Sequence, residues 1–322
     1  MTNNILITSA GQRVSLVRFF QREIKSLNSR NNIYTVDLNP DLAPACIISD
    51  GYKKVCRVTD SDYIENLLNI CQLWNIKLII PTIDTELLTL AKHKKIFLDN
   101  GIIPIVSSLD FVEKCRDKRL INKFFNKHNI DTPRTFNKNN LEFPLFVKPY
   151  DGSASKNSFL ISDKTEITEH LLNDPKMMFL EYITPDYEEF TIDAYYDRNN
   201  ILKCIVPRRR ISVRAGEINK GVTKKNELVD FIKTHLGKID GAIGCLTMQF
   251  FFNPETKRVI GIEINPRFGG GYPLSYLAGA NFPKLIIDEY ILNEEIQPFD
   301  DWEDNLLMLR YDNEVLVHNY EE

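Results

Sequence analysis

Short apolar runs alternate with amphipathic stretches along the first third of the chain. Three of these runs are followed by segments in which apolar residues recur every three or four positions, at residues 13–24, 62–74 and 86–101. The strand-like runs themselves occupy residues 4–10, 32–40, 52–59, 76–82 and 102–108. Apolar strands separated by amphipathic helices are typical of βαβ units, whose strands form one parallel sheet. The pattern therefore predicts a Rossmann-like α/β unit that extends to about Leu109.

The pattern changes after Phe111, where strand-like runs outnumber helical ones. Helices are expected at residues 113–130, 164–173, 225–237 and 272–292. Strands are expected at residues 143–150, 158–162, 177–183, 188–197, 201–214, 245–253 and 258–266. The turn "NPETK" joins the last two strands as a hairpin. Runs of strands followed by helices predict an α+β region joined to the first unit.

Composition and charge exclude several classes of protein. The net charge of −4 arises from 40 basic and 44 acidic residues, which gives no general affinity for nucleic acid or an anionic membrane. No apolar run reaches the roughly 18 residues that a membrane-spanning helix needs, and the N-terminus lacks the pattern of a secretion signal. The six cysteines are scattered without a CxxC pair, and the five histidines are equally dispersed. We therefore expect a cytoplasmic protein without a disulfide framework or a zinc site.

The first predicted loop does not fit dinucleotide binding. "SAGQR" has one glycine where a dinucleotide-binding loop has three, although Asp37 ends the second strand, where a ribose-binding acid would lie. Without the other glycines, Asp37 is expected to be a turn or cap residue. The N-terminal unit is therefore predicted to bind substrate rather than NAD, and an NAD-dependent dehydrogenase is disfavoured.

The stretch "VIGIEINPRFGGGYPLS" combines an apolar strand with polar side chains and three glycines. Glu263 and Asn265 share one face of this strand, because side chains two residues apart point the same way. If the hairpin is symmetric about residue 256, Gln249 lies opposite Glu263, and the three oxygen-bearing side chains converge. Oxygen ligands of this kind suit Mg²⁺, and Arg267 just beyond them can bind a phosphate. The glycines are expected to let the chain approach a ligand, and an exposed strand end with a glycine turn is the simpler alternative.

Further polar groups on either side of this hairpin suit a nucleotide. Lys148 lies inside the apolar strand "PLFVKP", where an ammonium needs an anionic partner, which a structural salt bridge would also supply. Lys118 follows Asp117 at a probable helix start. The loop "DGSASKN" brings backbone N–H groups and hydroxyls next to Lys156, which suits phosphate binding, although most Gly/Ser loops are only turns. The strands "FLEYI" and "EEFTID" carry acceptors for an adenine amine and ribose hydroxyls, at Glu181 and Glu189.

The order of these motifs resembles the ATP-grasp superfamily. Lys118, Lys148, "DGSASK", "FLEY", "EEFTID", Gln249 and "EINPRFGGG" follow the family's order, and the chain looks like the short relatives of the carbamoyl phosphate synthase large subunit. The resemblance implies a Rossmann-like pre-ATP-grasp domain at residues 1–110, a small ATP-grasp subdomain at 111–180 and a large subdomain with the metal site at 181–322. The fold class is thus α/β plus α+β. The chain departs from the family in having one glycine in "DGSASKN" and none before Glu189.

The resemblance also implies a role for each matched residue. Arg267 and Lys148 would act in catalysis, with Arg267 on the γ-phosphate or the phosphorylated intermediate. ATP and Mg²⁺, or Mn²⁺ in its place, are the implied cofactors, and Gln249, Glu263 and Asn265 would bind the metal. The nucleotide would be bound by Lys118, Lys148, Ser153, Ser155, Lys156, Glu181, Tyr182 and Glu189.

The chemistry that these parts support is phosphoryl transfer from ATP to a carboxylate, followed by attack of an amine on the acyl phosphate. Arg208, Arg210 and Arg214 share a strand face if alternation holds, which suggests a carboxylate-rich or phosphorylated substrate, although a solvated basic edge strand would have the same pattern. Small-molecule carboxylates and amines are thus the expected partners, and a homodimer is expected by analogy alone. Phosphorylation of bicarbonate or carbamate, and nucleotide binding without catalysis, remain as alternatives.

Overall fold

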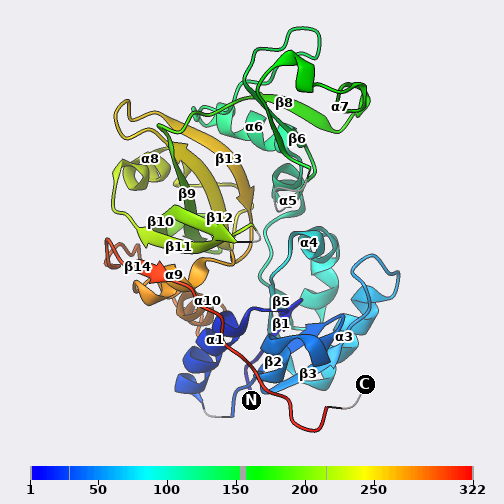
Figure 1. The fold of residues 1–322 in the computed structure, drawn as a ribbon. Helices are drawn as coiled ribbons and strands as arrows, with labels where there is room; N and C mark the ends of the chain where they lie inside the picture. The colour runs from blue at the N-terminus through cyan, green and yellow to red at the C-terminus, as the bar shows by residue number, and fades with distance from the viewer. Residues whose placement is uncertain (1, 29, 153–156, 215, 321–322) are drawn as a thin grey trace.

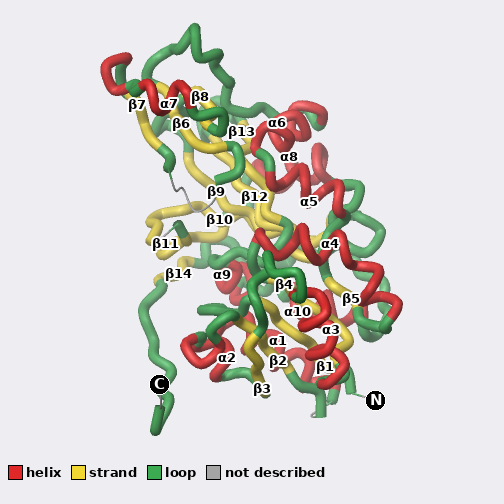
Figure 2. Tube along the Cα trace, turned by 90° about the vertical axis from the view of Figure 1, so that its right-hand side faces the viewer, coloured by secondary structure: helices red, strands yellow, loops and turns green. Residues whose placement is uncertain are grey.

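The computed structural model describes residues 2–28, 30–152, 157–214 and 216–320. Three sheets follow one another from end to end of the molecule, with the parallel sheet at the bottom of Figures 1 and 2 and the smallest sheet at the top. None of the described helices combines the length and the apolar character that crossing a bilayer requires.

The N-terminal unit is the predicted parallel sheet with helices on its faces. Its strand order is β3-β2-β1-β4-β5, and all four pairings are parallel. The strands are β1 (Asn4–Thr8), β2 (Ile33–Asp37), β3 (Gly51–Lys54), β4 (Ile76–Pro81) and β5 (Ile103–Pro104). The helices are α1 (Val14–Leu27), α2 (Pro44–Ile47), α3 (Tyr63–Leu73) and α4 (Asp84–Asp99), with a short 3-10 turn at Pro40–Leu42.

Asp37 is the last residue of β2, and its side chain stabilises the turn that follows, in keeping with the predicted turn or cap role. One carboxylate oxygen accepts the N–H of Gly11 at 3.0 Å and the other accepts the N–H of Asn39 at 3.1 Å. Gly11 has a φ of +47°, a conformation that a side chain disfavours. Asp37 therefore fixes the loop that leaves β1, which is the loop that carries Arg13.

A six-stranded sheet forms the centre of the molecule. Its order is β13-β12-β9-β10-β11-β14, and each pairing is antiparallel. The strands are β9 (Glu188–Tyr196), β10 (Leu202–Arg214), β11 (Glu217–Thr223), β12 (Gly244–Phe252), β13 (Val259–Asn265) and β14 (Leu307–Leu309). Strands β11 and β14 were not predicted, because "EINKGVT" is mostly polar and β14 has three residues.

Alternating side chains of this central sheet enter two separate cores. One face packs on α8 (Glu227–Leu236) through residues such as Ile192, Leu246 and Phe250. The opposite face places Tyr195, Val206 and Cys245 against the N-terminal unit and α10 (Phe282–Tyr290). Helices α1 and α10 lie side by side between the central and parallel sheets (Figure 1). The polar residues of the site lie on this second face, beyond the point where its apolar contacts end.

The third sheet forms a small lobe of its own. Strand β6 (Leu145–Pro149) lies between β7 (Phe159–Ile161) and β8 (Met177–Glu181). Leu145, Val147 and Phe179 form its core with Leu171 of α7 (Glu169–Asn173). The helix expected at residues 164–173 is a 3-10 turn at Lys164–Glu166 followed by α7.

The helix predicted at residues 113–130 is two helices, α5 (Leu109–Arg116) and α6 (Lys118–Lys127). Asp117 separates them, and its carboxylate caps α6 by accepting the N–H of Arg119 at 2.8 Å. Phe111 and Phe125 of these helices are buried in the core of the central sheet rather than in that of the small lobe. We therefore propose that the small lobe begins after α6, later than the boundary expected at residue 111.

Candidate active site

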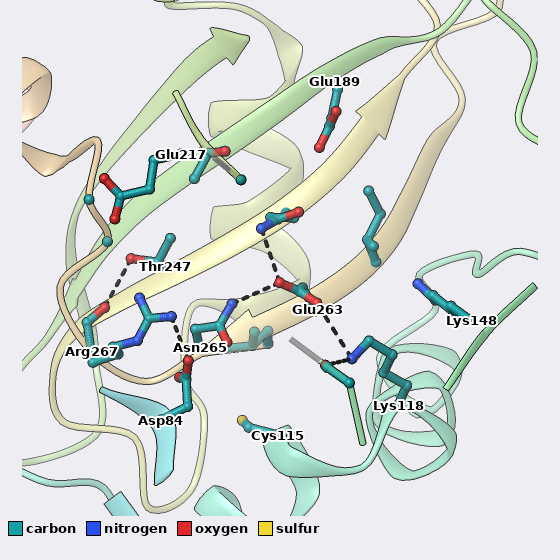
Figure 3. Close-up of a pocket in the computed structure, with 18 of the residues that line it drawn as sticks. Asp84, Cys115, Lys118, Lys148, Glu189, Glu217, Thr247, Glu263, Asn265 and Arg267 are labelled. Carbon is teal, nitrogen blue, oxygen red and sulfur yellow. Dashed lines mark hydrogen bonds and ion pairs between the residues drawn. The ribbon is translucent and has the colours of Figure 1, made fainter. Parts of the chain in front are cut away.

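A cavity of about 750 Å³ opens where the three sheets meet. Its walls come from β6 and β8 of the small lobe, from β9, β10, β12 and β13 of the central sheet, and from the loops that follow β1 and β4. Apolar residues line the end next to the small lobe, namely Phe146, Leu180, Ile183, Phe251 and Ile262. Charged and polar residues together make up most of the remainder, part of which is drawn in Figure 3.

Strand pairing brings the predicted metal ligands together. Gln249 of β12 is paired with Glu263 of β13, which confirms the register expected from the hairpin. Oε1 of Glu263 accepts hydrogen bonds from the side-chain amides of Gln249 at 3.0 Å and Asn265 at 2.9 Å. The three side chains therefore form one group on the cavity wall, of which Figure 3 labels Glu263 and Asn265.

Two lysines face this group from the other side of the cavity. The ammonium of Lys118, from the first turn of α6, lies 3.9 Å from Oε2 of Glu263 and also donates to the carbonyl oxygen of Gly152. Lys148 of β6 lies beside it (Figure 3), and none of the described carboxylates comes within 4.0 Å of its ammonium. Burial lowers the pKa of Lys148 to about 8, with Lys118 acting in the same direction and Glu263 and Glu189 opposing it. The structural salt bridge considered for Lys148 is thus not formed in the described part of the chain.

Glu189 points into the cavity from β9 (Figure 3), 3.2 Å from the guanidinium of Arg210. Burial raises the pKa of Glu189, and Glu263 adds to this effect, while Arg210 and Lys148 oppose it. Glu181 and Tyr182 line the apolar end, and the carboxylate of Glu181 accepts the backbone N–H of Arg134 at 3.1 Å. The carboxylate of Glu181 is therefore already engaged at the edge of the cavity.

Arg267 lies at the opposite end of the site, just beyond β13. Its Nη2 is 2.6 Å from Oδ2 of Asp84, the first residue of α4, and its backbone carbonyl accepts from the Thr247 hydroxyl at 2.9 Å. This ion pair connects the N-terminal unit to the central sheet within the cavity wall (Figure 3).

The three glycines after Arg267 make room for protein side chains. A Cβ at Gly269, Gly270 or Gly271 would collide with Thr247, Glu217 or Arg208, respectively. None of the three has a positive φ, so close approach rather than backbone conformation requires glycine here. The expected close approach therefore involves these side chains of the protein itself, although the glycines also line the cavity.

The alternation that would place Arg208, Arg210 and Arg214 on one strand face does not extend to Arg214. Arg208 and Arg210 line the cavity, whereas Arg214 is exposed and pairs with Asp312 at 2.5 Å. The register of β10 against β11 shifts twice between Arg210 and Val213, which breaks the assumed alternation. Arg208 is fully buried and binds Asp193 through two hydrogen bonds of 2.8 and 2.9 Å.

Some site residues were missed or lie outside the described residues. Ser153, Ser155 and Lys156 are among the latter, so their predicted contacts with phosphate stay predictions. Four further residues belong to the site without having been predicted, namely Arg13, Asp84, Asp193 and Glu217. Asp193 could have been found, since it continues the face of Glu189 in "EEFTID", and Asp84 could have been found at the end of a predicted strand. Nothing in the sequence indicated Arg13 or Glu217.

The donor set fits a magnesium ion that is also bound by phosphates. Among the residues described, no group of three or more His, Cys, Asp or Glu side chains is placed to hold a metal. Glu263 supplies one carboxylate, and Gln249 and Asn265 would each offer an oxygen once the amide has rotated. Mg²⁺ commonly has one or two protein carboxylates and takes its other ligands from phosphates and water. The residues therefore suit Mg²⁺ that arrives with a nucleotide better than they suit a metal held by protein alone.

Two family models match the sequence. Residues 5–105 match the model described as "PylC-like, N-terminal domain", and residues 173–310 match the one described as "ATP-grasp in the biosynthetic pathway with Ter operon". A search of curated proteins gives no match to this sequence.

Solved structures share the fold over almost the whole chain. Biotin carboxylase from Campylobacter jejuni superposes with a TM-score of 0.71 at 13% identity, over 95% of this chain and 74% of that one. L-amino acid ligase from Bacillus licheniformis superposes with a TM-score of 0.66 at 17% identity, over 92% of this chain and 77% of that one. Pyruvate carboxylase from Rhizobium etli superposes with a TM-score of 0.71 at 12% identity, over 95% of this chain. The superposed part is 30% of the length of that protein. At these identities the likeness establishes the fold.

Proposed function

This chain belongs to the ATP-grasp superfamily, and we propose that it is an ATP- and Mg²⁺-dependent ligase that joins a carboxylate to an amine. One observation carries the proposal. The oxygen ligands of Glu263, Gln249 and Asn265 lie across one cavity from Lys118 and Lys148, in a space of about 750 Å³. Such an arrangement suits a magnesium-bound triphosphate.

The first step transfers the γ-phosphoryl group. A carboxylate oxygen of the substrate forms a bond to the γ-phosphorus, and the bond to the β-phosphate oxygen breaks, which releases ADP. Lys148 and Arg267 offset the negative charge that the transferred group carries, and Lys118 binds the phosphates that remain on ADP. Glu263, Gln249 and Asn265 would hold Mg²⁺, whose positive charge would neutralise part of the charge of the phosphates.

The second step forms the amide. The amine attacks the acyl carbon, the carbon–oxygen bond to phosphate breaks, and the amine loses a proton as phosphate leaves. Water would hydrolyse the acyl phosphate, so the reaction needs a site shielded from solvent. The half-buried position of Lys148 and the lowering of its pKa by burial indicate such shielding beside the phosphate site.

Nucleotide binding is the first expected result. With metal present, ATP at a hundredfold excess over its Kd should stabilise the protein by about 2.7 kcal/mol and raise the melting temperature. EDTA should remove most of the shift, because the donor set needs the metal to bind the phosphates. Thermal unfolding with ATP, ADP and GTP, with and without Mg²⁺, measures this, and an unchanged melting temperature with MgATP would contradict the proposal.

Product release separates the ligase from its alternatives. Carboxylates paired with amines should release ADP and phosphate in equal amounts, and hydroxylamine should trap the acyl phosphate as a hydroxamate. If ADP appears only with bicarbonate and ammonia, the protein phosphorylates bicarbonate instead. If MgATP binds and no pair yields ADP, nucleotide binding without catalysis replaces the proposal.

Binding of MgATP should also take up a proton at pH about 8. In the free protein, the pKa of Lys148 is about 8 because burial outweighs the opposing influence of Glu263 and Glu189, and Lys118 adds to the lowering. Phosphate next to Lys148 favours the ammonium form and therefore raises the pKa of Lys148. Protons are then taken up on binding at and above pH about 8, and the affinity for nucleotide falls as the pH rises further. Near pH about 6 the lysine is protonated in both states, and uptake should vanish.

Calorimetry in two buffers with different ionisation enthalpies measures the number of protons taken up. Lys148→Met should abolish the uptake and weaken nucleotide binding. Lys164→Met, which removes an exposed lysine from the same lobe, is the matched control and should keep both. Equal uptake in wild type and Lys148→Met would show that another group titrates.

A further inference from the structure

The end of the cavity farthest from the small lobe is rich in arginine. Arg13 reaches it from the loop after β1, Arg208 from β10 and Arg267 from the end of β13. Glu217 and Asp84 line the same end. Figure 3 shows Glu217, Asp84 and Arg267 on the opposite side of the view from Lys118 and Lys148. This end therefore lies away from the two lysines, and a substrate whose reacting carboxylate is beside Arg267 would extend into it.

The cations at this end outnumber the carboxylates. Glu217 is shared by Arg13 at 3.3 Å and Arg310 at 3.2 Å, and Asp84 pairs with Arg267 at 2.6 Å. Counting Arg310, which binds Glu217 but is not part of the cavity lining, three arginines thus face two carboxylates, while Arg208 is neutralised separately by Asp193. Burial lowers the pKa of Arg13, Glu217 opposes this, and the nearby cations Arg267 and Arg310 lower it further. One positive charge is therefore left over at this end of the cavity.

Two of the arginines that line this end also have buried N–H groups without an acceptor. Nη1 of Arg208 and Nε of Arg267 have no hydrogen-bond partner among the described residues. Arg208 is wholly buried, and its other nitrogens bind Asp193 in two short hydrogen bonds. A buried donor without a partner costs about 1–3 kcal/mol. Nη1 of Arg208 packs against Gly271, which lines the cavity, so an acceptor on a ligand that reaches Gly271 would offset this cost.

We propose that this end of the cavity binds a second oxyanion on the acid substrate, a carboxylate or a phosphate, with Arg13 and Arg208 as its donors. The inference rests on the proposed function, in which a first carboxylate of the same substrate reacts beside Arg267. An arginine fork matches the oxygens of either group, and the excess positive charge disfavours an ammonium at this position. The phosphates of ATP do not account for the site, because Lys118 and Lys148 bind them at the other end.

The inference assigns a role to the N-terminal unit. Arg13 belongs to the loop that Asp37 fixes, so the parallel sheet supplies a residue that selects the substrate. Arg13 is a better residue to replace than Arg208, because 21% of its side chain is exposed. After its replacement, Arg310 still pairs with the carboxylate of Glu217. Removing Arg208 would instead leave Asp193 buried without its cation.

The experiment measures anion binding while the nucleotide site is filled. The protein is saturated with Mg²⁺ and a non-hydrolysable ATP analogue, and its melting temperature is followed with inorganic phosphate, malonate, methylammonium or chloride at matched ionic strength. Phosphate or malonate should stabilise the wild-type complex more than chloride does, and which of the two binds more tightly identifies the oxyanion. Arg13→Gln should raise the Kd for that anion about 10- to 100-fold, which is the change expected from the loss of one charge-assisted hydrogen bond.

Arg18→Gln is the matched control, since Arg18 is an exposed arginine on α1 of the same unit. It should leave anion binding unchanged, and Arg13→Gln should leave the stabilisation by the MgATP analogue unchanged. The inference is overturned if neither anion stabilises beyond chloride, if Arg13→Gln binds them as wild type does, or if methylammonium stabilises instead. Loss of the analogue's effect in wild type would refute the proposed function, so the two failures are distinguishable.

Discussion

Glu263→Gln is expected to lower the rate of ATP turnover by at least about a hundredfold. Glu263 supplies the only carboxylate of the proposed metal site, and its Oε1 accepts both amide hydrogen bonds there. Glutamine keeps the size and one acceptor oxygen, so the hairpin should retain its packing while the charge that attracts Mg²⁺ is lost. Initial rates of ADP release at several Mg²⁺ concentrations measure the effect, and higher Mg²⁺ should restore part of it.

Glu255→Gln provides the matched control for this variant. Glu255 is exposed in the turn of the same β12–β13 hairpin, so its replacement changes the same charge outside the cavity. We expect its turnover to equal that of wild type. If Glu263→Gln retained full turnover with an unchanged requirement for Mg²⁺, the metal site would have to lie elsewhere.

Asp193→Ala is expected to destabilise the protein by about 3–5 kcal/mol, because it leaves the guanidinium of Arg208 buried without a counter-charge. Both side chains of this pair have no exposed surface, and Asp193 also accepts hydrogen bonds from Ser275 at 2.6 Å and Thr247 at 3.4 Å. The free energy of unfolding in urea and the melting temperature measure the loss.

Asp312→Ala breaks an exposed pair with Arg214, which lies on the same strand as Arg208, and is the control for burial. Arg214 and Asp312 are mostly solvent-exposed, so their separation should cost at most about 1 kcal/mol. The double variant Arg208→Met/Asp193→Leu should recover much of the lost stability, because it leaves no buried charge. Equal effects of Asp193→Ala and Asp312→Ala would show that Arg208 relaxes towards solvent and that the buried pair is dispensable.

The sequence predicted those parts of the fold that depend on local pattern. Apolar strands between amphipathic helices predicted the parallel sheet, since such strands must be covered on both faces. The alternation of Glu263 and Asn265, together with the position of the turn, predicted the pairing with Gln249. The register of a hairpin is fixed by residues close in sequence, so this part of the site could be predicted.

Contacts between distant segments could not be predicted in the same way. Arg13 and Asp84 reach the cavity because α1 and α10 pack the N-terminal unit against the central sheet, an arrangement that no local period encodes. The sequence predicts that the glycines of residues 269–271 let the chain approach a ligand, and only the packing shows that they accommodate Thr247, Glu217 and Arg208.

By itself, then, the sequence determined which elements form and which polar residues share a strand face, because both follow from periods of two and about 3.6 residues. The tertiary structure decided which of those faces meet around one cavity. It placed Arg208 in a buried pair and, through the register shifts in β10, moved Arg214 out to solvent. Burial and charge pairing depend on neighbours that are distant in the chain, so they appear only once the sheets have packed together.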